Sequence, residues 1–425
     1  VVSAPAMREK IANFPFPEAT RDVRKDLASL GKPRILGTLI AVWLLPSALI
    51  CRIWGVPRHG DNDEAGLLFT SGSSGEPKGV ALTHRNILAN CGQISATGIL
   101  PRTETLLACL PLFHSFGFTV MMWYVLIASM RAVTIPSPLD QKKMIEAIEQ
   151  EKVSILVGTP TFLRPLLKKA EPRQLKSLRF AVSGAERLPD DLYHAYQSTL
   201  GVFLFQGYGL TETTPVASVN VPDPQNLPKG VKLQVGHRLG SVGRLVAGMT
   251  AKIIDPDTGR ELDATSTGMI LLKGPNVFNG YLNDPQKSAE ALAPGGWFLT
   301  GDLARFDDDG FLFIEGRQSR FSKIGGEMVP HVTIEQRIIE AFEVKAEDAS
   351  HIVVMGVPDA AKGEALVLLT TIGIDPIALR EKLAALGLPN LWIPKIVHHI
   401  DAIPMLGSGK TDLKACKKLA MDAVR

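Results

Sequence analysis

A run of hydroxyl-bearing residues and glycines ends in a lysine and has the composition of a phosphate-binding loop. It reads Thr-Ser-Gly-Ser-Ser-Gly-Glu-Pro-Lys-Gly over residues 70–79. Small residues let backbone N–H groups approach an anion, and hydroxyl groups add further donors. The residues expected to contact phosphate are Thr70, Ser71, Gly72, Ser73, Ser74, Gly75 and Lys78. The loop is not a Walker A motif, because that motif needs Ser or Thr directly after the lysine, where Gly79 stands.

Four later segments fit the same nucleotide chemistry. They are Tyr208-Gly-Leu-Thr-Glu-Thr213, Thr300-Gly-Asp302, Gly316-Arg317 and Pro404-Met-Leu-Gly-Ser-Gly-Lys410. Taken in order with the first loop, they resemble the motifs of the adenylate-forming (AMP-binding) superfamily, which includes acyl-CoA synthetases, firefly luciferase and adenylation domains. The resemblance runs over nearly the whole chain.

Within that superfamily the chain looks most similar to the acyl-acyl-carrier-protein synthetase portion of bacterial 2-acylglycerophosphoethanolamine acyltransferase. The segments that carry this narrower resemblance are residues 110–117, 136–139, 274–282, 326–329 and 362–368. The most discriminating of them are Gly326-Glu-Met-Val329 and Lys362-Gly-Glu-Ala-Leu-Val-Leu368.

The resemblance implies that ATP and Mg²⁺ activate a long-chain fatty acid as an acyl-adenylate, and that a thiol then accepts the acyl chain. The first step brings a carboxylate against a triphosphate, so the site needs cations and hydrogen-bond donors more than a base. By resemblance, Lys410 stabilises the adenylating transition state and Glu212 holds Mg²⁺. Thr211 is expected to bind the α-phosphate, and His114 to lie near the fatty-acid carboxylate.

Other matched positions are expected to bind the nucleoside or to serve the second step. Tyr208 is expected to stack on adenine, and Asp302 and Arg317 to bind the ribose. The backbone expected on the other side of the base is that of Gly184, Ala185 and Glu186. Lys323 and Gly326 match residues that face the thioester-forming step. One position departs from the pattern: Ser319 stands where the superfamily usually has a hinge Asp or Lys.

Composition excludes several classes of protein. With 425 residues and 45% hydrophobic content, the chain can form two or three domains. A formal charge of only +3 gives no general case for nucleic-acid binding, although Lys414, Lys417, Lys418 and Arg425 cluster near the end and could bind an acidic partner. Four cysteines without CxxC spacing argue against zinc and against a disulfide framework. A cytoplasmic location, with the inner face of the cell membrane as a further site, is the expectation.

Strand-like runs alternate with helical patterns up to about residue 205, which predicts an α/β fold with a mostly parallel sheet. We expect an AMP-binding large domain over residues 1–318, with a small β-barrel-like subdomain at about 240–313. A mobile α+β lid is expected over residues 319–425. Compared with the superfamily, the opening part of the large domain is expected to be truncated.

Residues 35–51 carry no charge and contain Pro46. This run is short for a bilayer-spanning helix, which needs about 20 apolar residues. Three alternatives fit this run: a membrane span, an interfacial membrane contact, or a buried or capping helix. The buried or capping helix is preferred. A second uncharged run, Phe116 to Met130, is interpreted as a core helix or a wall of an acyl tunnel.

Three functions remain in competition. The leading one is a fatty acid:acyl-carrier-protein ligase, the nearest rival is a long-chain acyl-CoA ligase, and the third is a non-catalytic acyl- or nucleotide-binding module. Lysophospholipid acyltransferases pair His with an Asp five positions later, and none of the nine histidines is followed in this way. Such an activity would therefore need an acyltransferase domain fused outside this sequence.

Overall fold

The computed structural model describes residues 2–3, 21–71, 77–224, 234–325, 327–344, 351–359, 361–405 and 411–424. The chain forms two compact units, Val1–Gly60 and Asp61–Arg425. The division into domains at residues 318 and 319 stays a prediction.

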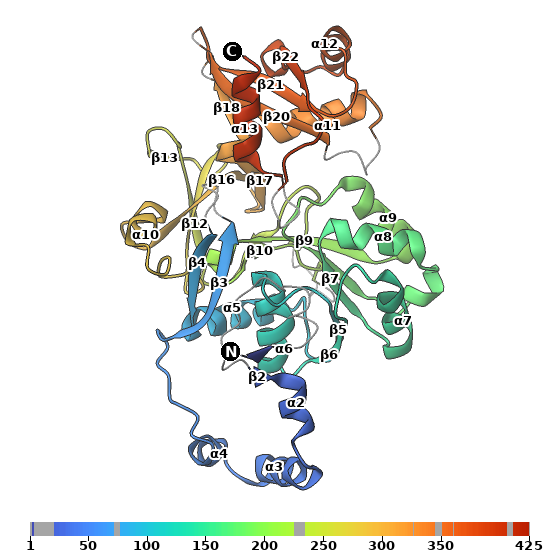
Figure 1. Ribbon diagram of the computed structural model, residues 1–425, viewed down its shortest axis with the longest axis vertical. Coiled ribbons are helices and arrows are strands. Elements are labelled where there is room, and N and C mark those ends of the chain that lie inside the picture. Colours follow the sequence, from blue (N-terminus) through green and yellow to red (C-terminus); the bar gives the residue numbers. More distant parts are fainter. Residues whose placement is uncertain are drawn as a thin grey trace. The chain divides into compact units, whose positions relative to one another are not determined.

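The first unit is small and mostly helical. Strands β1 (Val2–Ser3) and β2 (Arg21–Asp22) pair in parallel, and α2 (Val23–Ala28), α3 (Lys32–Leu44) and α4 (Ser47–Ile53) follow as the blue helices of Figure 1. The preferred prediction at residues 35–51 was a buried or capping helix; burial is contradicted within this unit, because neither α3 nor α4 contains a buried residue, and the capping role stays a prediction. Pro46 separates the two helices, since the residue before a proline is disfavoured in helical conformation and Leu45 is extended. Among the described residues, no helix has the length and apolar character needed to cross a bilayer.

A seven-stranded sheet lies at the centre of the second unit, in the order β11-β10-β9-β8-β7-β5-β6. Strands β5 (Thr105–Ala108), β6 (Arg131–Thr134), β7 (Ile155–Gly158), β8 (Phe180–Ser183) and β9 (Phe203–Gly209) are parallel. Strands β10 (Val216–Val219) and β11 (Arg244–Leu245) extend one edge in antiparallel direction. The predicted α/β class with a mostly parallel sheet is confirmed.

Both faces of this sheet are buried, because successive side chains of a strand point to opposite faces and both sets are apolar. Leu106 and Ile155 pack into one core with α5 (His84–Thr97) and with α6 (Tyr124–Ile127). Their neighbours Leu107 and Leu156 pack into a second core. The second core is covered by α7 (Gln141–Glu151), α8 (Pro160–Lys169) and α9 (Asp190–Leu200), which lie together on one side of the sheet in Figure 1.

Further elements complete the first core. The hairpin of β3 (Glu64–Ser71) and β4 (Pro77–Thr83) packs Leu68 and Leu82 into it. The uncharged run at Phe116 to Met130 forms the π-helix η1 (Gly117–Trp123) and α6, with Val120 and Met121 in the same core. A short 3-10 helix, η2 (Pro172–Leu175), connects α8 to β8.

A six-stranded antiparallel sheet follows. It contains β12 (Thr250–Ile254), β13 (Glu261–Leu262), β14 (Gly268–Lys273), β15 (Leu292–Ala293), β16 (Trp297–Phe306) and β17 (Leu312–Arg317). Helix α10 (Pro285–Ala291) lies between β14 and β15 in the chain. The segment predicted as a β-barrel-like subdomain forms most of this sheet, and its status as a subdomain stays a prediction.

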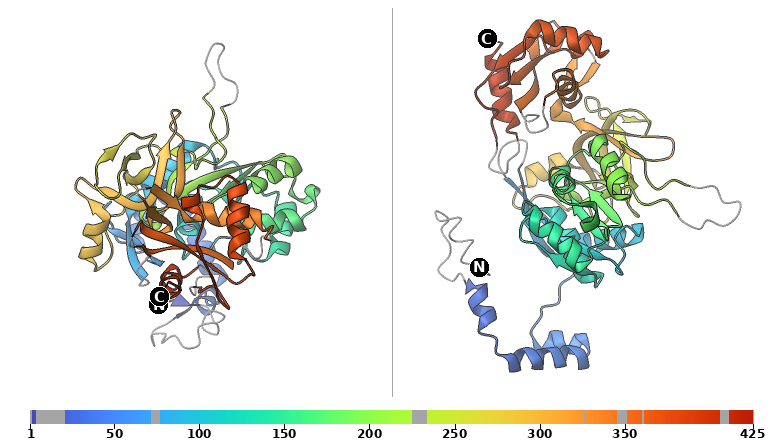
Figure 2. Two further views of the ribbon diagram at one scale, coloured as in Figure 1. Left: turned by 90° about the horizontal axis from the view of Figure 1, so that it is seen from above. Right: turned by 90° about the vertical axis from the view of Figure 1, so that its right-hand side faces the viewer.

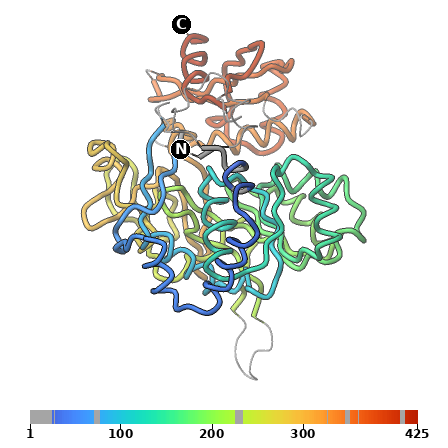
Figure 3. The backbone as a smooth tube through the Cα atoms, turned by 60° about the horizontal axis from the view of Figure 1, so that its bottom comes forward, coloured from blue at the N-terminus to red at the C-terminus, as the bar shows by residue number. Residues whose placement is uncertain are grey.

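The last sheet has helices on both faces, as the orange and red elements of Figures 2 and 3 show. After η4 (Gln318–Arg320) it is built from β18 (Phe321–Ile324), β19 (Glu327–Pro330), β20 (Ile352–Asp359), β21 (Gly363–Thr370) and β22 (Ile396–His399). Helices α11 (His331–Ala341) and α12 (Pro376–Ala385) share one core with it, and α13 (Leu413–Asp422) shares another. The 3-10 helix η6 (Asn390–Trp392) precedes β22.

Two glycines provide a matched test of this packing. A Cβ atom added at Gly209, at the end of β9, would overlap the carbonyl oxygen of Pro215, whereas a Cβ at Gly92 in the middle of α5 meets nothing within 4 Å. Gly209→Ala should therefore lower the free energy of unfolding, and Gly92→Ala should raise it by about 0.5–1 kcal/mol through helix propensity. Denaturant unfolding of both variants checks this. Equal effects of the two substitutions would contradict the close approach of β9 to the segment after the 3-10 helix η3 (Thr211–Thr213).

Candidate functional site

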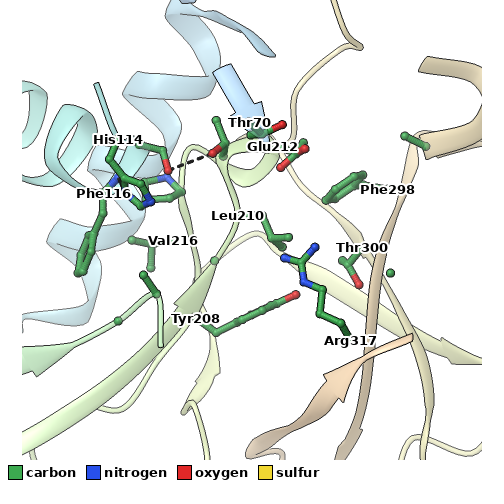
Figure 4. A pocket seen from close by; sticks show the side chains of 18 of the residues that line it. Thr70, His114, Phe116, Tyr208, Leu210, Glu212, Val216, Phe298, Thr300 and Arg317 are labelled. Atoms are coloured by element: carbon green, nitrogen blue, oxygen red, sulfur yellow. Dashed lines mark hydrogen bonds between the residues drawn. The ribbon is translucent and has the colours of Figure 1, made fainter. Parts of the chain in front are cut away.

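A cavity of about 740 Å³ is lined by most of the predicted site residues that the structure describes. Its walls come from the β3–β4 hairpin, the segment before η1, the ends of β8 and β9, and the junction after β17. The predicted residues that line it are Thr70, Lys78, His114, Gly184, Ala185, Tyr208, Thr211, Glu212 and Arg317. Figure 4 shows Tyr208 and Arg317 on one side of this cavity, with Thr70 and Glu212 on another.

The cavity lies where parallel strands end. In open α/β sheets, ligands bind outside the carboxyl ends of the strands, and Gly184 follows β8 directly. A Cβ atom at Gly184 would lie 2.9 Å from the ring of Phe116, so glycine lets this wall approach the segment before η1 closely. The topology thus places the backbone of Gly184 and Ala185 beside the cavity.

Asp302 does not itself line the cavity, but it forms an ionic and hydrogen-bonded group with Arg317 and Tyr208, which do line it. Asp302 on β16 is register partner of Arg317 on β17, and Arg317 Nε lies 2.9 Å from Asp302 Oδ1. The Tyr208 hydroxyl donates to Asp302 Oδ2 at 2.5 Å. Asp302 is only 3% exposed, and Arg317 keeps 59% of its side chain exposed.

Burial dominates the electrostatics of this group. Desolvation raises the pKa of Asp302, and the nearby Arg317 and the Tyr208 hydrogen bond lower it by less. The pKa of Tyr208 lies well above its ordinary value because of burial and the neighbouring Asp302 carboxylate. Keeping this carboxylate charged in the folded protein costs stability, because burial disfavours the charged form more than Arg317 and Tyr208 favour it.

Glu212 lies at the other end, in the 3-10 helix η3 (Thr211–Thr213), and is 8% exposed. The Tyr281 hydroxyl donates to its Oε1 atom at 2.9 Å, and Phe278 N donates to its backbone oxygen at 2.9 Å. Lys78 Nζ lies 4.8 Å from the centre of the Tyr281 ring. Burial first, and then the Glu212 charge, raise the pKa of Tyr281, so its hydroxyl stays protonated and keeps donating. A buried, oriented carboxylate thus lies near a cation and the first residue of the phosphate loop.

Asn276 holds the η3 turn in place from a distant part of the chain. It is fully buried, and its side chain donates to the backbone oxygens of Thr213 at 2.7 Å and Val216 at 3.1 Å. The Thr214 hydroxyl donates to the Asn276 backbone oxygen at 2.7 Å. These bonds satisfy buried carbonyl groups that would otherwise cost about 1–3 kcal/mol each.

Sequence reasoning assigned no role to Tyr281 or Asn276, although both lie in the segment 274–282 that carried the narrower resemblance. That membership was the available signal. Their function depends on contacts with residues more than sixty positions earlier, which sequence spacing does not reveal.

Glu212 fits a magnesium site of the kind that uses few protein ligands. The described residues contain no group of three or more His, Cys, Asp or Glu that could hold a metal by itself. Mg²⁺ typically takes one or two carboxylates plus substrate phosphates, and keeps water for the rest. A single buried carboxylate at the phosphate end of the cavity is compatible with that pattern.

Other predicted residues have different surroundings. Thr211 Oγ1 donates to Ser115 Oγ at 3.4 Å, and exposed His114 accepts a bond from Phe116 N at 3.2 Å. The Glu186 side chain does not line the cavity, because its carboxylate accepts a bond from the Thr161 hydroxyl at 2.7 Å.

Lys323 lies outside the cavity, where it forms an ion pair with Asp257. Residues 72–76, Gly326 and Lys410 are outside the described residues, as is the side chain of Ser71.

A model of the AMP-binding enzyme family matches residues 41–282. The chain is 31% identical over 357 residues to a long-chain-fatty-acid–CoA ligase of Bacillus subtilis, covering 82% of this chain and 60% of the relative. It is 32% identical to 4-coumarate–CoA ligase 2 of rice (Oryza sativa subsp. japonica), covering 82% of this chain and 61% of the relative. Among solved structures it is similar to ATP-bound MatB from Rhodopseudomonas palustris, with TM-score 0.72, 28% identity, and 86% and 70% of the two chains covered.

The chain spans about 60% of the length of these two curated relatives.

The raised pKa of Asp302 generates a stability prediction. Above that pKa the carboxylate is charged and desolvated in the folded state, so the neutral isostere in Asp302→Asn should unfold at an equal or higher temperature. As the pH falls from the raised pKa of folded Asp302 to the ordinary pKa of an Asp in the unfolded chain, the folded carboxyl takes up its proton first, and the advantage of the variant should shrink and disappear. Thermal unfolding of both proteins across pH measures this difference. A variant less stable at every pH would instead make the Asp302–Arg317 pair a structural ion pair.

Proposed function

The chain belongs to the AMP-binding enzyme family, whose model matches more than half of its residues, and we propose that it is an acid–thiol ligase. In this proposal ATP activates a long-chain fatty acid as an acyl-adenylate. The acyl group then passes to the phosphopantetheine thiol of acyl carrier protein, in support of lysophospholipid acylation.

The observation that carries the proposal is the arrangement of two buried acids in one region of the fold. Glu212 lies beside Lys78 and Thr70, as a phosphate-binding end requires, and buried Asp302 lies with Arg317 and Tyr208, as a ribose-binding end requires. Asp302 would accept from ribose hydroxyls, and the Tyr208 ring would contact the base. Lys78, Glu212, Tyr208 and Arg317 line the same cavity, and Asp302 is joined to it through Tyr208 and Arg317, which supports a nucleotide as the proposed ligand.

In adenylation the fatty-acid carboxylate attacks the α-phosphorus of ATP, an acyl–phosphate bond forms, and pyrophosphate leaves. Mg²⁺, when bound with ATP, neutralises phosphate charge that would otherwise repel the carboxylate. Glu212 would hold the ion, with its carboxylate oriented by the Tyr281 hydroxyl. Lys78 would add positive charge, Thr211 would donate to the α-phosphate, and Lys410 would act on the charge that develops in this step.

In the second step the thiol sulfur attacks the acyl carbon and AMP leaves with the bonding electrons. We propose that the segment after residue 318 acts as a lid that exchanges between the two steps, with Lys323 and Gly326 facing the thiol. Arg317 pairs with Asp302 in the six-stranded sheet. Arg320 pairs with Glu335 in α11 and donates to Val354 O at 3.1 Å in the last sheet. The residues between these anchors, Gln318 and Ser319, are the proposed hinge.

A fatty acid is proposed as substrate because much of the cavity is apolar. Val182, Val216, Val219 and Phe116 line it, and they offer no charged partner for a polar side group. The name of the Bacillus relative points in the same direction. His114 would lie near the carboxylate of the bound acid.

Acyl carrier protein is proposed as acceptor on the basis of the resemblance at residues 326–329 and 362–368 and of the basic helix α13. Lys414 and Lys418 are exposed on that helix. Lys417 is excluded from the proposed docking surface, because its ammonium donates to the Gly356 backbone oxygen. A long-chain acyl-CoA ligase is the alternative, and a non-catalytic acyl- or nucleotide-binding module is the alternative of another class. A place at the inner face of the cell membrane and fusion to an acyltransferase domain are further parts of the proposal.

The decisive experiment incubates the protein with ATP, Mg²⁺ and a long-chain fatty acid, together with either holo-acyl carrier protein or CoA. Mass detection of the thioester should show the carrier protein as the better acceptor. The double variant Lys414→Glu, Lys418→Glu should slow transfer to the carrier protein in a salt-sensitive way, because exposed charges are screened over about 10 Å at 0.1 M ionic strength.

Adenylation, measured as pyrophosphate exchange, should be unchanged in that double variant. Lys142→Glu, on a lysine with 86% side-chain exposure in α7, is the matched control. A preference for CoA together with no effect of the reversal would select the acyl-CoA ligase, and no adenylation at all would select the binding module.

Tyr281→Phe tests the orientation of Glu212. Loss of the hydroxyl should raise the Mg²⁺ concentration needed for half-maximal pyrophosphate exchange by roughly 10-fold, since partners that orient a ligand typically contribute that much to metal affinity. Tyr124→Phe, which removes a buried hydroxyl bonded to the Leu100 backbone oxygen instead, should leave the Mg²⁺ dependence unchanged. An unaltered Mg²⁺ requirement in Tyr281→Phe would remove Glu212 from the metal site.

A further inference from the structure

The segment 27–60 has a charge composition unlike the rest of the chain. The whole chain contains 46 basic and 43 acidic residues, but this segment contains Lys32, Arg34, Arg52 and Arg58 and no Asp or Glu. All four cations lie outside the apolar run: two precede it and two follow it. An apolar stretch is therefore bounded on both sides by positive charge.

The structure folds this stretch into α3 and α4, whose apolar side chains are not covered by other residues of their own unit. Trp43 is 87% exposed, Leu44 64% and Leu39 60%, and neither helix has a buried residue. Single exposed apolar residues are ordinary on a soluble surface, but a continuous apolar surface of this kind marks an interaction site.

The geometry of the two helices decides between spanning a bilayer and lying in its surface. The 13 residues of α3 rise only about 20 Å, less than the roughly 30 Å of a hydrocarbon core. Lys32 and Arg34 are at the start of α3, whereas Arg52 is in the last turn of α4. The cations thus lie at the two outer ends, and Trp43, Leu44 and the Pro46 turn lie between them.

We propose that α3 and α4 are an interfacial anchor for an anionic phospholipid bilayer. The apolar residues around Leu39 and Trp43 enter the boundary between headgroups and acyl chains. Lys32, Arg34, Arg52 and Arg58 bind lipid phosphates. Long cationic side chains can extend toward the headgroups while their neighbours are immersed, and tryptophan favours this interface. The anchor extends the proposed function, because it would hold the enzyme where a long-chain fatty acid is concentrated.

Charge complementarity favours lipid over a protein occupant. A second copy of these helices would cover apolar surface, but it would bring four cations against four others, with no acid within the segment to compensate. An anionic bilayer satisfies both features, since each Lys or Arg near such a surface strengthens binding roughly fivefold.

Flotation of the full chain with vesicles tests the anchor, without ATP or fatty acid. Vesicles that contain phosphatidylglycerol should carry the protein to the top of a density gradient, and vesicles of phosphatidylcholine alone should carry much less. Trp43→Ser should weaken binding by at least about tenfold, since a large immersed apolar side chain is lost. The double variant Arg34→Glu, Arg52→Glu should abolish the preference for the anionic lipid.

Two matched controls use other exposed residues. Ile377→Ser replaces a side chain that is 70% exposed on α12, and Lys142→Glu reverses a distant cation. Both should float like the unaltered protein.

Equal flotation with the two kinds of vesicle, or variants that bind like the controls, would overturn the proposal. Oligomers that dissociate on Trp43→Ser while vesicles fail to bind would assign the surface to a second copy. A loss of thermal stability in Trp43→Ser without vesicle binding would assign it to packing within the protein. Because pyrophosphate exchange is assayed separately in vesicle-free solution, failure of the anchor and failure of the proposed ligase activity are distinguishable.

Discussion

The turn that carries Glu212 depends on the segment 274–282, which supplies the groups that pair its buried backbone. Asn276 binds the carbonyls of Thr213 and Val216, and Phe278 N binds the carbonyl of Glu212 itself. The same segment is joined to α5, where Asn86 donates to Pro275 O and Val277 O at 2.9 Å each. It is also joined to the β3–β4 hairpin, through Leu282 N and Gly79 O at 2.8 Å. The phosphate-loop hairpin and the carboxylate are therefore held by one stretch of chain.

This arrangement explains how buried acids are held beside a cavity whose walls are largely apolar. A buried acid is expensive unless its partners are fixed in advance, and preorganised partners also spare reorganisation when a ligand binds. Asp302 receives such partners from β17 and β9, and Glu212 receives them from Tyr281. The raised pKa of Asp302 shows that the partners offset only part of the cost.

Local sequence signals predicted much of this architecture. The predicted alternation up to about residue 205 forms the parallel strands β5 to β9 with helices between them, and nine of the predicted site residues line one cavity. The alternation of strand-like and helical patterns predicted the fold class, because strands joined by helices form a parallel sheet that the helices cover on both faces.

The sequence could not show contacts between distant positions. Tyr281 and Asn276 act on η3 from more than sixty residues away, and Glu186 turns to α8 although its two predecessors line the cavity. Lys417 was grouped with Lys414 and Lys418 as a candidate contact for an acidic partner, but its ammonium donates to the Gly356 backbone oxygen on β20. The uncharged run at 35–51 was expected to be a buried or capping helix, and composition alone could not show that nothing within its small unit buries it.

The two arginines around η4 have a mechanical consequence. Arg317 is tied to Asp302 on β16, and Arg320 is tied through Glu335 and the Val354 carbonyl to the sheet that follows. In the proposed lid motion, rotation between the two sheets would therefore fall on the backbone of Gln318 and Ser319. The small side chain of Ser319 leaves this backbone free to change φ and ψ, so the ease of the motion depends on backbone preferences rather than on an ionic contact at position 319.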